Sequence, residues 1–126
     1  MSLDLIPTKD RLLYLVEQHE DNVEDSIVDT ICKSILEINS EDEYLFKLGV
    51  AHNYVYNPSP IKLYINSYGG DVYPFFGLID IINTSITPIH TITLGSAMSS
   101  ALLVAISGHK RFAYRNSTFM YHQISS

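Results

Sequence analysis

The sequence predicts an α/β protein with a mostly parallel sheet. Runs of strand length that are rich in apolar residues, at residues 61–66 and 89–94, alternate with segments of helical character. Strands buried on both faces carry such runs, and parallel neighbours need a helical crossover between them. A turn rich in small residues directly follows each of these strands, at residues 67–71 and 95–99. Because ligands bind at the carboxyl ends of parallel strands, these two turns are the candidate site.

Length and composition favour a single globular domain. The chain has 126 residues, of which 46% are apolar, and this is enough for one modest core. The net charge is −6 and positive charge gathers only at Lys110, Arg111 and Arg115, so we expect no nucleic-acid partner. No apolar run reaches the length of about 20 residues that spans a bilayer. The N-terminus also lacks a signal-peptide pattern, so we expect no membrane association and a cytoplasmic location.

The single cysteine, Cys32, excludes an internal disulfide. Its apolar surroundings in the sequence indicate a small core residue, with a cysteine nucleophile as the alternative. The histidines lack metal-ligand spacing and no cysteine pair exists, so neither a metal nor an organic cofactor is expected.

We expect the chain to begin with a loose arm over residues 1–10, followed by one domain over residues 11–126. Residues 12–16 form the first expected strand. A helix follows that Asp21 or Asn22 caps and that ends at Asn39-Ser40. Its apolar stripe, at helical spacing, consists of Val23, Ile27, Val28, Ile31, Ile35, Leu36 and Ile38.

Residues 41–60 are the least informative stretch, with a short helix expected over 41–50 and a proline-rich loop over 57–60. In the second half we expect a helix over residues 74–83, whose inward residues are Phe75, Leu78, Ile79 and Ile82. An apolar helix over residues 99–106 follows and ends at Gly108. Short strands are expected over residues 111–114 and 118–121.

The turn that ends in Ser99 has the composition of a nucleophile turn. Small residues from Gly95 onward allow a tight bend, and the free N–H groups at the start of the next helix would face a developing oxyanion. The alternative is that small residues simply permit close packing of helix on sheet.

The turn at Gly69 and Gly70 offers unobstructed backbone N–H groups. One donor from this turn and one beside Ser99 would make an oxyanion hole. The alternative is a tight turn without a ligand. It is not a phosphate loop, because the Lys-Ser/Thr pair is absent.

A serine nucleophile needs a base, and five histidines are available. His122 follows the last expected strand, near the carboxyl ends of the other strands, and is the candidate. His109 stands beside Lys110 and Arg111, which makes it a poor base. The remaining histidines lie in polar, irregular or mid-strand positions.

Four motifs, in order and at a spacing near that of the family, make residues 12–123 resemble the family of ClpP, the proteolytic subunit of the Clp protease. The family patterns are Tyr-Ile-Asn-Ser-Pro-Gly-Gly, Gly-x-Ala-x-Ser, Lys-Arg-Phe with Pro-Asn-Ser, and Met-x-His-Gln. This sequence has Tyr64-Ile65-Asn66-Ser67-Tyr68-Gly69-Gly70, Gly95-Ser96-Ala97-Met98-Ser99, Lys110-Arg111-Phe112 with Arg115-Asn116-Ser117, and Met120-Tyr121-His122-Gln123.

The resemblance implies a spiral of ββα units and a serine endopeptidase that hydrolyses unfolded polypeptides through an acyl-enzyme. Ser99 would be the nucleophile, His122 the base, and the N–H groups of Gly70 and Ser100 the oxyanion hole. It also implies a homo-oligomer of two stacked seven-membered rings, fed by an AAA+ unfoldase, with residues 1–10 as an axial gate. The docking patch for the unfoldase, or alternatively ordinary strand residues, would be Tyr64, Ile92, Leu94, Phe112 and Tyr114.

The sequence departs from the family in five places. The segment between Ser99 and His122 is slightly shorter, and Gly108 is interpreted as the position of the deletion. Tyr68 replaces the proline of the glycine turn, Ser100 stands where methionine is usual, and residues 41–60 are longer than the family's connection and are interpreted as an insertion. The sequence also stops at Ser126, before the orienting aspartate and the handle region between rings. Because loss of that aspartate costs a factor of about 10⁴ in turnover, we expect this chain alone to be weak or inactive.

Two other functions remain open. The missing aspartate and Tyr68 are compatible with a non-catalytic ClpP-like subunit or an inactive fragment. A crotonase-type acyl-CoA enzyme shares the spiral architecture and the oxyanion hole, but its acid/base pair is usually glutamate.

Overall fold

The computed structural model describes residues 5–16, 25–70 and 72–121. The elements alternate as the sequence predicts. In chain order they are β1 (Leu12–Val16), α1 (Asp25–Ala51), β2 (Ile61–Ser67), α2 (Val72–Thr84), β3 (Ile89–Met98), α3 (Ser100–Ser107), β4 (Lys110–Ala113) and β5 (Thr118–Met120).

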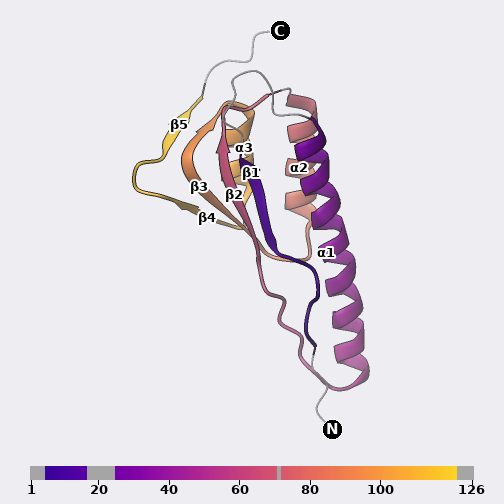
Figure 1. Ribbon diagram of the computed structural model, residues 1–126. Coiled ribbons are helices and arrows are strands. Elements are labelled where there is room, and N and C mark those ends of the chain that lie inside the picture. The colour runs from indigo at the N-terminus through magenta and orange to yellow at the C-terminus, as the bar shows by residue number, and fades with distance from the viewer. Residues whose placement is uncertain (1–4, 17–24, 71, 122–126) are drawn as a thin grey trace.

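The sheet is parallel and its strands follow the order β1-β2-β3-β4. β5 pairs with the end of β3, beyond the part of β3 that pairs with β4. From β1 to β4, each successive strand is therefore added on the same side of the previous one. The helices lie on one face of this sheet, and the opposite face of β2, β3 and β4 is uncovered (Figure 1). The predicted α/β fold with a parallel sheet is confirmed.

The core lies between the sheet and the helices. Along β2 the side chains alternate, so that Ile61, Leu63 and Ile65 are fully buried while Lys62 faces solvent. The helices complete the core with a stripe that includes Ile31 and Ile35 of α1. The other buried core members are Leu15, Val28, Ile38, Phe75, Leu78, Ile82, Ile89, Ala97, Ala101, Val104 and Ala105. The prediction that Leu36 belongs to the buried stripe is wrong, because this side chain is 54% exposed.

The prediction that the first helix ends at Asn39 and Ser40 is also wrong, because α1 continues unbroken to Ala51. The amide nitrogen of Asn39 donates to the Ile35 carbonyl (2.7 Å), and its oxygen accepts the Ile86 N–H (2.7 Å). These contacts satisfy the side chain within the helix and remove its reason to compete for the backbone. The helix expected over residues 41–50 is present as the second half of α1.

A buried ion pair attaches the C-terminal half of α1 to the residue that precedes β1. Both terminal nitrogens of Arg11 donate to the Asp42 carboxylate, at 2.9 and 2.6 Å, and Tyr56 Oη donates to the same group at 2.6 Å. Burial alone would raise the pKa of Asp42, but hydrogen bonds from Arg11, Thr87 and Tyr56 outweigh it and hold the pKa below its usual value. Burial and the neighbouring carboxylate raise the pKa of Tyr56 to about 12.

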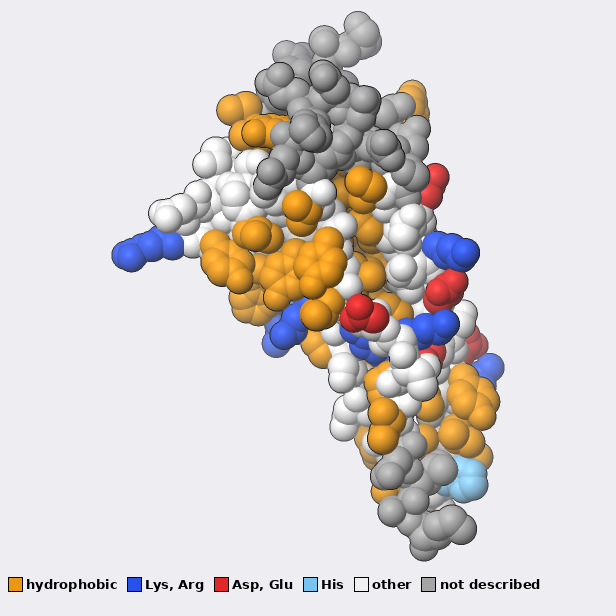
Figure 2. All heavy atoms as spheres, in the orientation of Figure 1, with side chains coloured by type: hydrophobic (Ala, Val, Ile, Leu, Met, Phe, Trp, Pro, Cys, Tyr) orange, Lys and Arg blue, Asp and Glu red, His pale blue; other side chains and the backbone are white. Residues whose placement is uncertain are grey.

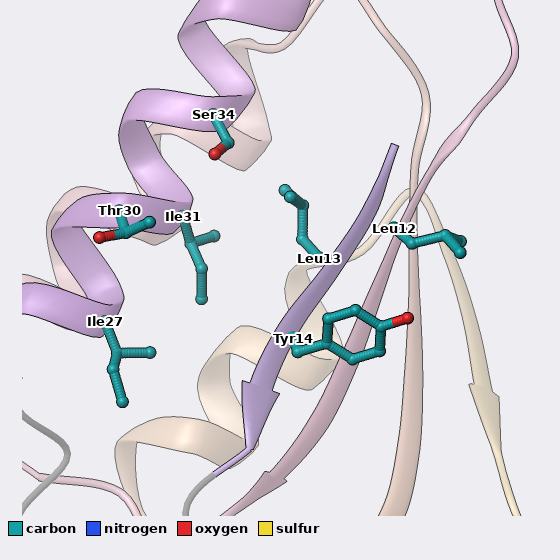
Figure 3. A pocket seen from close by; sticks show the side chains of 7 residues that line it. All are labelled: Leu12, Leu13, Tyr14, Ile27, Thr30, Ile31 and Ser34. Atoms are coloured by element: carbon teal, nitrogen blue, oxygen red, sulfur yellow. The ribbon is translucent and has the colours of Figure 1, made fainter. Parts of the chain in front are cut away.

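A hollow of about 330 Å³ lies between α1 and β1 (Figure 3). Leu13 points from the strand toward Ile31 and Ser34 of the helix, while Leu12 and Tyr14 point the other way. The lining consists of Leu12, Leu13, Tyr14, Ile27, Thr30, Ile31 and Ser34. None of these is a predicted site residue, so this hollow is separate from the site described next.

Candidate active site

Ser99 occupies the junction between β3 and α3. Its backbone has φ 56° and ψ −125°, the geometry of the first central residue of a type II′ turn, which glycine normally occupies. A non-glycine residue held in such a region costs about 1–3 kcal/mol and marks a place where the surrounding structure fixes the backbone. The turn therefore falls at Ser99 itself and not across residues 95–98, which belong to β3.

An irregularity between β2 and β3 leads into this junction. Ile65 pairs with Thr93 and Ser67 pairs with Ala97, so Asn66 alone lies opposite three residues of β3. The Asn66 side-chain oxygen accepts the Ser96 N–H at 3.1 Å. Gly95 has φ 79°, and a Cβ there would lie 2.6 Å from that same oxygen. The extra residues re-aim the end of β3 and thereby direct Ser99 toward the glycine turn.

The glycine turn after β2 lies directly against Ser99. Gly69 has φ 94°, and a Cβ at this position would lie 2.7 Å from the Met98 carbonyl oxygen, 3.1 Å from Ser99 Cβ and 3.3 Å from Ser100 N. Glycine is therefore needed here for both its backbone conformation and its close approach. The Gly69 N–H donates to Ser67 Oγ at 3.0 Å, which fixes the first half of the turn. The two candidate turns thus form one site.

Gly70, the predicted oxyanion donor, contacts the Ser100 side chain. Ser100 Oγ donates a hydrogen bond to the Gly70 carbonyl at 3.1 Å. Ser100 Oγ also accepts a hydrogen bond from the Gly70 N–H at 3.3 Å. The backbone N–H of Ser100 belongs to the first residue of α3 and lies beside Gly69. The structure therefore brings the two predicted donors to the same junction.

The last described strand, β5, also reaches the junction. The Ser99 N–H donates to the Met120 carbonyl at 2.8 Å, next to the pairing of Met98 with Met120. The predicted base, His122, follows two residues later and lies outside the described residues. Its predicted role stays a prediction.

Two other histidines have structural surroundings. His109 Nδ1 accepts the Ile89 N–H at 3.0 Å, and its Nε2 lies 3.0 Å from the Ile82 carbonyl, so the ring connects β3 to the end of α2. Burial, followed by the charges of Lys110, Lys62 and His109, lowers the pKa of His90. His90 lies in the pocket on the uncovered face of the sheet, and the helices pack on the opposite face.

That uncovered face carries an apolar row across four strands. Tyr14, Tyr64, Ile92 and Phe112 occupy paired positions on β1 to β4, and the rings of Tyr14 and Tyr64 stack with centroids 5.6 Å apart. A pocket of about 480 Å³ opens there, and its lining consists of Pro60, Lys62, Tyr64, His90, Ile92 and Phe112. Figure 2 shows hydrophobic side chains gathered over β2 to β4. Of the predicted docking residues, Leu94 and Tyr114 do not line this pocket.

Sequence reasoning missed three side chains that hold the site together. Ser67 and Ser100 hydrogen-bond to the backbone of the glycine turn, and Asn66 hydrogen-bonds to the Ser96 N–H of β3. The available signal was their chemistry, since asparagine and serine next to glycines commonly hydrogen-bond turn backbone.

No helix among residues 25–70 and 72–121 is both long and apolar enough to cross a membrane. In the same part of the chain, no group of three or more histidine, cysteine and acidic side chains has the arrangement of a metal site.

The fold and the site define an α/β protein in which a strained serine at a strand–helix junction faces a glycine turn. The family model "Clp protease" matches residues 8–126. The chain belongs to the Clp protease family.

Individual relatives agree with this assignment. The ATP-dependent Clp protease proteolytic subunit of Streptococcus agalactiae is 32% identical over 117 residues, which cover 91% of this chain and 50% of the relative. The chain therefore spans about half the length of the curated relatives it matches. The ClpP protease catalytic domain of Plasmodium falciparum has a TM-score of 0.69 at 28% identity, covering 90% of this chain and 55% of that one. A ClpP1 mutant from Listeria monocytogenes shares the fold at a TM-score of 0.71 and 19% identity, and the match covers 92% of this chain and 58% of that one.

Proposed function

We propose that this chain contributes the nucleophile of a Clp-type serine endopeptidase that hydrolyses unfolded polypeptides. The single observation that carries the proposal is the backbone strain at Ser99, directly opposite the Gly69 turn. Strain of this kind persists where the structure over-determines a conformation, and it clusters at active sites. Membership of the Clp protease family supports a protease, and the serine chemistry is our proposal.

The chemistry follows the usual course of acyl transfer. Ser99 Oγ attacks the scissile carbonyl carbon, and His122 takes the hydroxyl proton and returns it to the leaving amine. The N–H groups of Gly70 and Ser100 donate to the oxyanion that forms on the carbonyl oxygen. The hydrogen bond from the Ser99 N–H to the Met120 carbonyl supports the role of His122, because Met120 lies beside Ser99 and precedes that histidine by two residues in the sequence.

A fluorophosphonate probe tests the nucleophile. We expect the complete gene product to be labelled on Ser99, as read by mass spectrometry, and the Ser99→Ala variant to lose both the label and peptide hydrolysis. Ser107→Ala is the matched control, because it removes a serine hydroxyl at the far end of α3, which donates to the Leu103 carbonyl (2.6 Å) away from the junction. Peptide hydrolysis by Ser99→Ala at the normal rate would rule the proposal out. Comparison with residues 1–126 alone measures what this part of the site achieves by itself.

The proposal extends to partners that the names of the relatives suggest. The matched curated relatives are subunits of an ATP-dependent protease, so we propose an AAA+ unfoldase as the partner and a cytoplasmic homo-oligomer of two stacked seven-membered rings. The pocket lined by Tyr64, Ile92 and Phe112 is the proposed docking surface, because an apolar, uncovered sheet face suits an apolar segment of a partner.

The two alternatives are outcomes of the same tests. A non-catalytic subunit would take no label in the complete gene product, yet would assemble with an active relative. The match to the Clp protease family favours a peptidase over a crotonase-type enzyme, and saturable binding of an acyl-CoA would reverse that preference.

A further inference from the structure

The structure assigns a second role to Ser100, through its side chain. We propose that the Ser100 hydroxyl is a positioning residue that holds the Gly70 peptide in place as an oxyanion donor. This inference rests on the proposed function of Ser99. The Ser100 side chain is 1% exposed, and its hydroxyl contacts both the N–H and the carbonyl of Gly70.

The glycine turn needs such an attachment. Glycine loses more conformational freedom on folding than any other residue, and Gly69 and Gly70 are adjacent. Position 68 holds a tyrosine, 45% exposed, which does not restrict φ as a proline would. Two serine hydroxyls secure the turn from either side, because Ser67 Oγ holds the N–H of Gly69 and Ser100 Oγ holds the carbonyl of Gly70.

The position of Ser100 in the chain couples this attachment to the nucleophile. Ser100 is the first residue of α3 and directly follows Ser99. Its hydroxyl therefore fixes the distance between the turn and the two groups that must act together, Ser99 Oγ and the Ser100 N–H. A peptide group held in place before the reaction does not have to be reoriented when charge develops, which is the source of its stabilising effect.

The two hydrogen bonds have different strengths and different roles. The contact from Gly70 N to Ser100 Oγ, at 3.3 Å, is longer than the usual 2.9–3.0 Å of N–H···O bonds. A negatively charged oxygen is a stronger acceptor than a hydroxyl, so an oxyanion takes over this N–H. The hydroxyl keeps its own proton on the Gly70 carbonyl throughout. Ser100 therefore acts on the transition state and leaves substrate binding unchanged.

The prediction is a selective effect on turnover in the complete gene product. We expect Ser100→Ala to lower kcat for a short peptide by about 10-fold with KM within 2-fold, since an interaction made only in the transition state affects kcat. The affinity for a peptide boronate, which forms a tetrahedral adduct on the serine, should fall by a similar factor. Ser100→Cys fills the same space with a weak donor and should behave like Ser100→Ala. The matched control, Ser107→Ala, should behave like the unmodified protein.

Several outcomes separate this inference from the proposed function. Normal turnover in Ser100→Ala, with Ser99→Ala inactive, overturns the inference and leaves the proposed function intact. Normal turnover in Ser100→Cys shows that the side chain only fills space, and faster turnover in Ser100→Ala shows that the hydroxyl competes with the oxyanion. Either result overturns the inference. Undiminished hydrolysis by Ser99→Ala overturns the proposed function and the inference together.

Discussion

At the scale of single residues, conformation marks the site more sharply than side-chain chemistry does. Serine is common on protein surfaces, but Ser99 combines a positive φ with a position at the end of a parallel strand. Among the described residues, the other non-glycine residue with positive φ is Asn53, in the loop after α1, where asparagine tolerates this conformation well. Ser99 has no such intrinsic preference, so the site itself must maintain its backbone.

This strain predicts a trade between stability and activity. Ser99→Gly relieves about 1–3 kcal/mol of strain but gives the unfolded chain extra freedom worth roughly 0.5–1 kcal/mol. We therefore expect a net gain of about 1 kcal/mol in the free energy of unfolding, measured by urea denaturation, together with complete loss of peptide hydrolysis. Ser99→Ala is the matched control, because it removes the hydroxyl and keeps the strain. Equal stability of the two variants would show that the φ of Ser99 stores no strain.

The residues of the site were predictable in part. Gly69, Gly70 and Ser99 could be found because a glycine pair and a turn of small residues each follow an apolar strand directly, where parallel sheets bind their ligands. The Asn66 and Ser100 contacts could not be found, because they depend on a three-dimensional match between segments 30 residues apart. Local sequence says that such side chains bond to backbone somewhere, and only the fold says where.

At the scale of elements, α1 shows how tertiary contacts override local signals. Asn39 and Ser40 favour a helix end, yet the helix continues through them because Asn39 finds partners in Ile35 and Ile86. The second half of α1 then reaches Arg11 through Asp42. The strand–helix alternation itself was predictable, because hydrophobic periodicity is local to each element. Helix length was not, because it depends on residues from distant parts of the chain.

The buried pair of Arg11 and Asp42 predicts a specific dependence of stability on pH. Removing one partner of a buried ion pair costs about 3–5 kcal/mol, so Asp42→Asn should lower the free energy of unfolding by that amount at pH 7. The folded-state pKa of Asp42 lies below its unfolded value of about 3.9, so the unfolded state binds more protons between the two. This contribution is therefore present above pH 4 and is lost as the pH falls through the folded pKa.

Urea unfolding from pH 7 to pH 3 measures this effect. The gap in stability between the unmodified protein and Asp42→Asn should narrow as the pH falls below about 4. Glu43→Gln is the matched control, because Glu43 neighbours Asp42 but forms an exposed pair with Lys47 at 3.2 Å. Such exposed helix pairs contribute only about 0.3–0.5 kcal/mol. A gap that stays constant with pH would show that Asp42 does not titrate with a lowered pKa.

At the scale of the whole molecule, the sheet has two different faces. The helices pack on one face, and the carboxyl ends of β2 and β3 carry the glycine turn and Ser99 (Figure 1). The other face presents the row of Tyr14, Tyr64, Ile92 and Phe112, which has no partner among the described elements. A change on this second face, which is the proposed docking surface, therefore does not touch the candidate active site.

This separation predicts that Tyr64→Ala will uncouple unfoldase-dependent degradation from peptide hydrolysis. Tyr64 lines the pocket of about 480 Å³ and stacks on Tyr14, so its loss removes apolar surface from the centre of the row. Buried aromatic anchors in an interface commonly contribute 2 kcal/mol or more, and a loss of about 2 kcal/mol corresponds to roughly 30-fold in affinity. We expect ATP-dependent degradation of an unfolded protein by the complete gene product and a Clp unfoldase to fall by at least about 10-fold.

Peptide hydrolysis in the same preparation is the internal control, because a short peptide needs no unfoldase and its rate should stay within 2-fold. Tyr44→Ala provides the matched variant: Tyr44 is a 64% exposed tyrosine on α1, outside the row, and its loss should leave both activities unchanged. Parallel loss of both activities in Tyr64→Ala would mean that the residue supports the fold and not docking. Normal ATP-dependent degradation would mean that the unfoldase binds elsewhere, and the apolar row would then need another occupant.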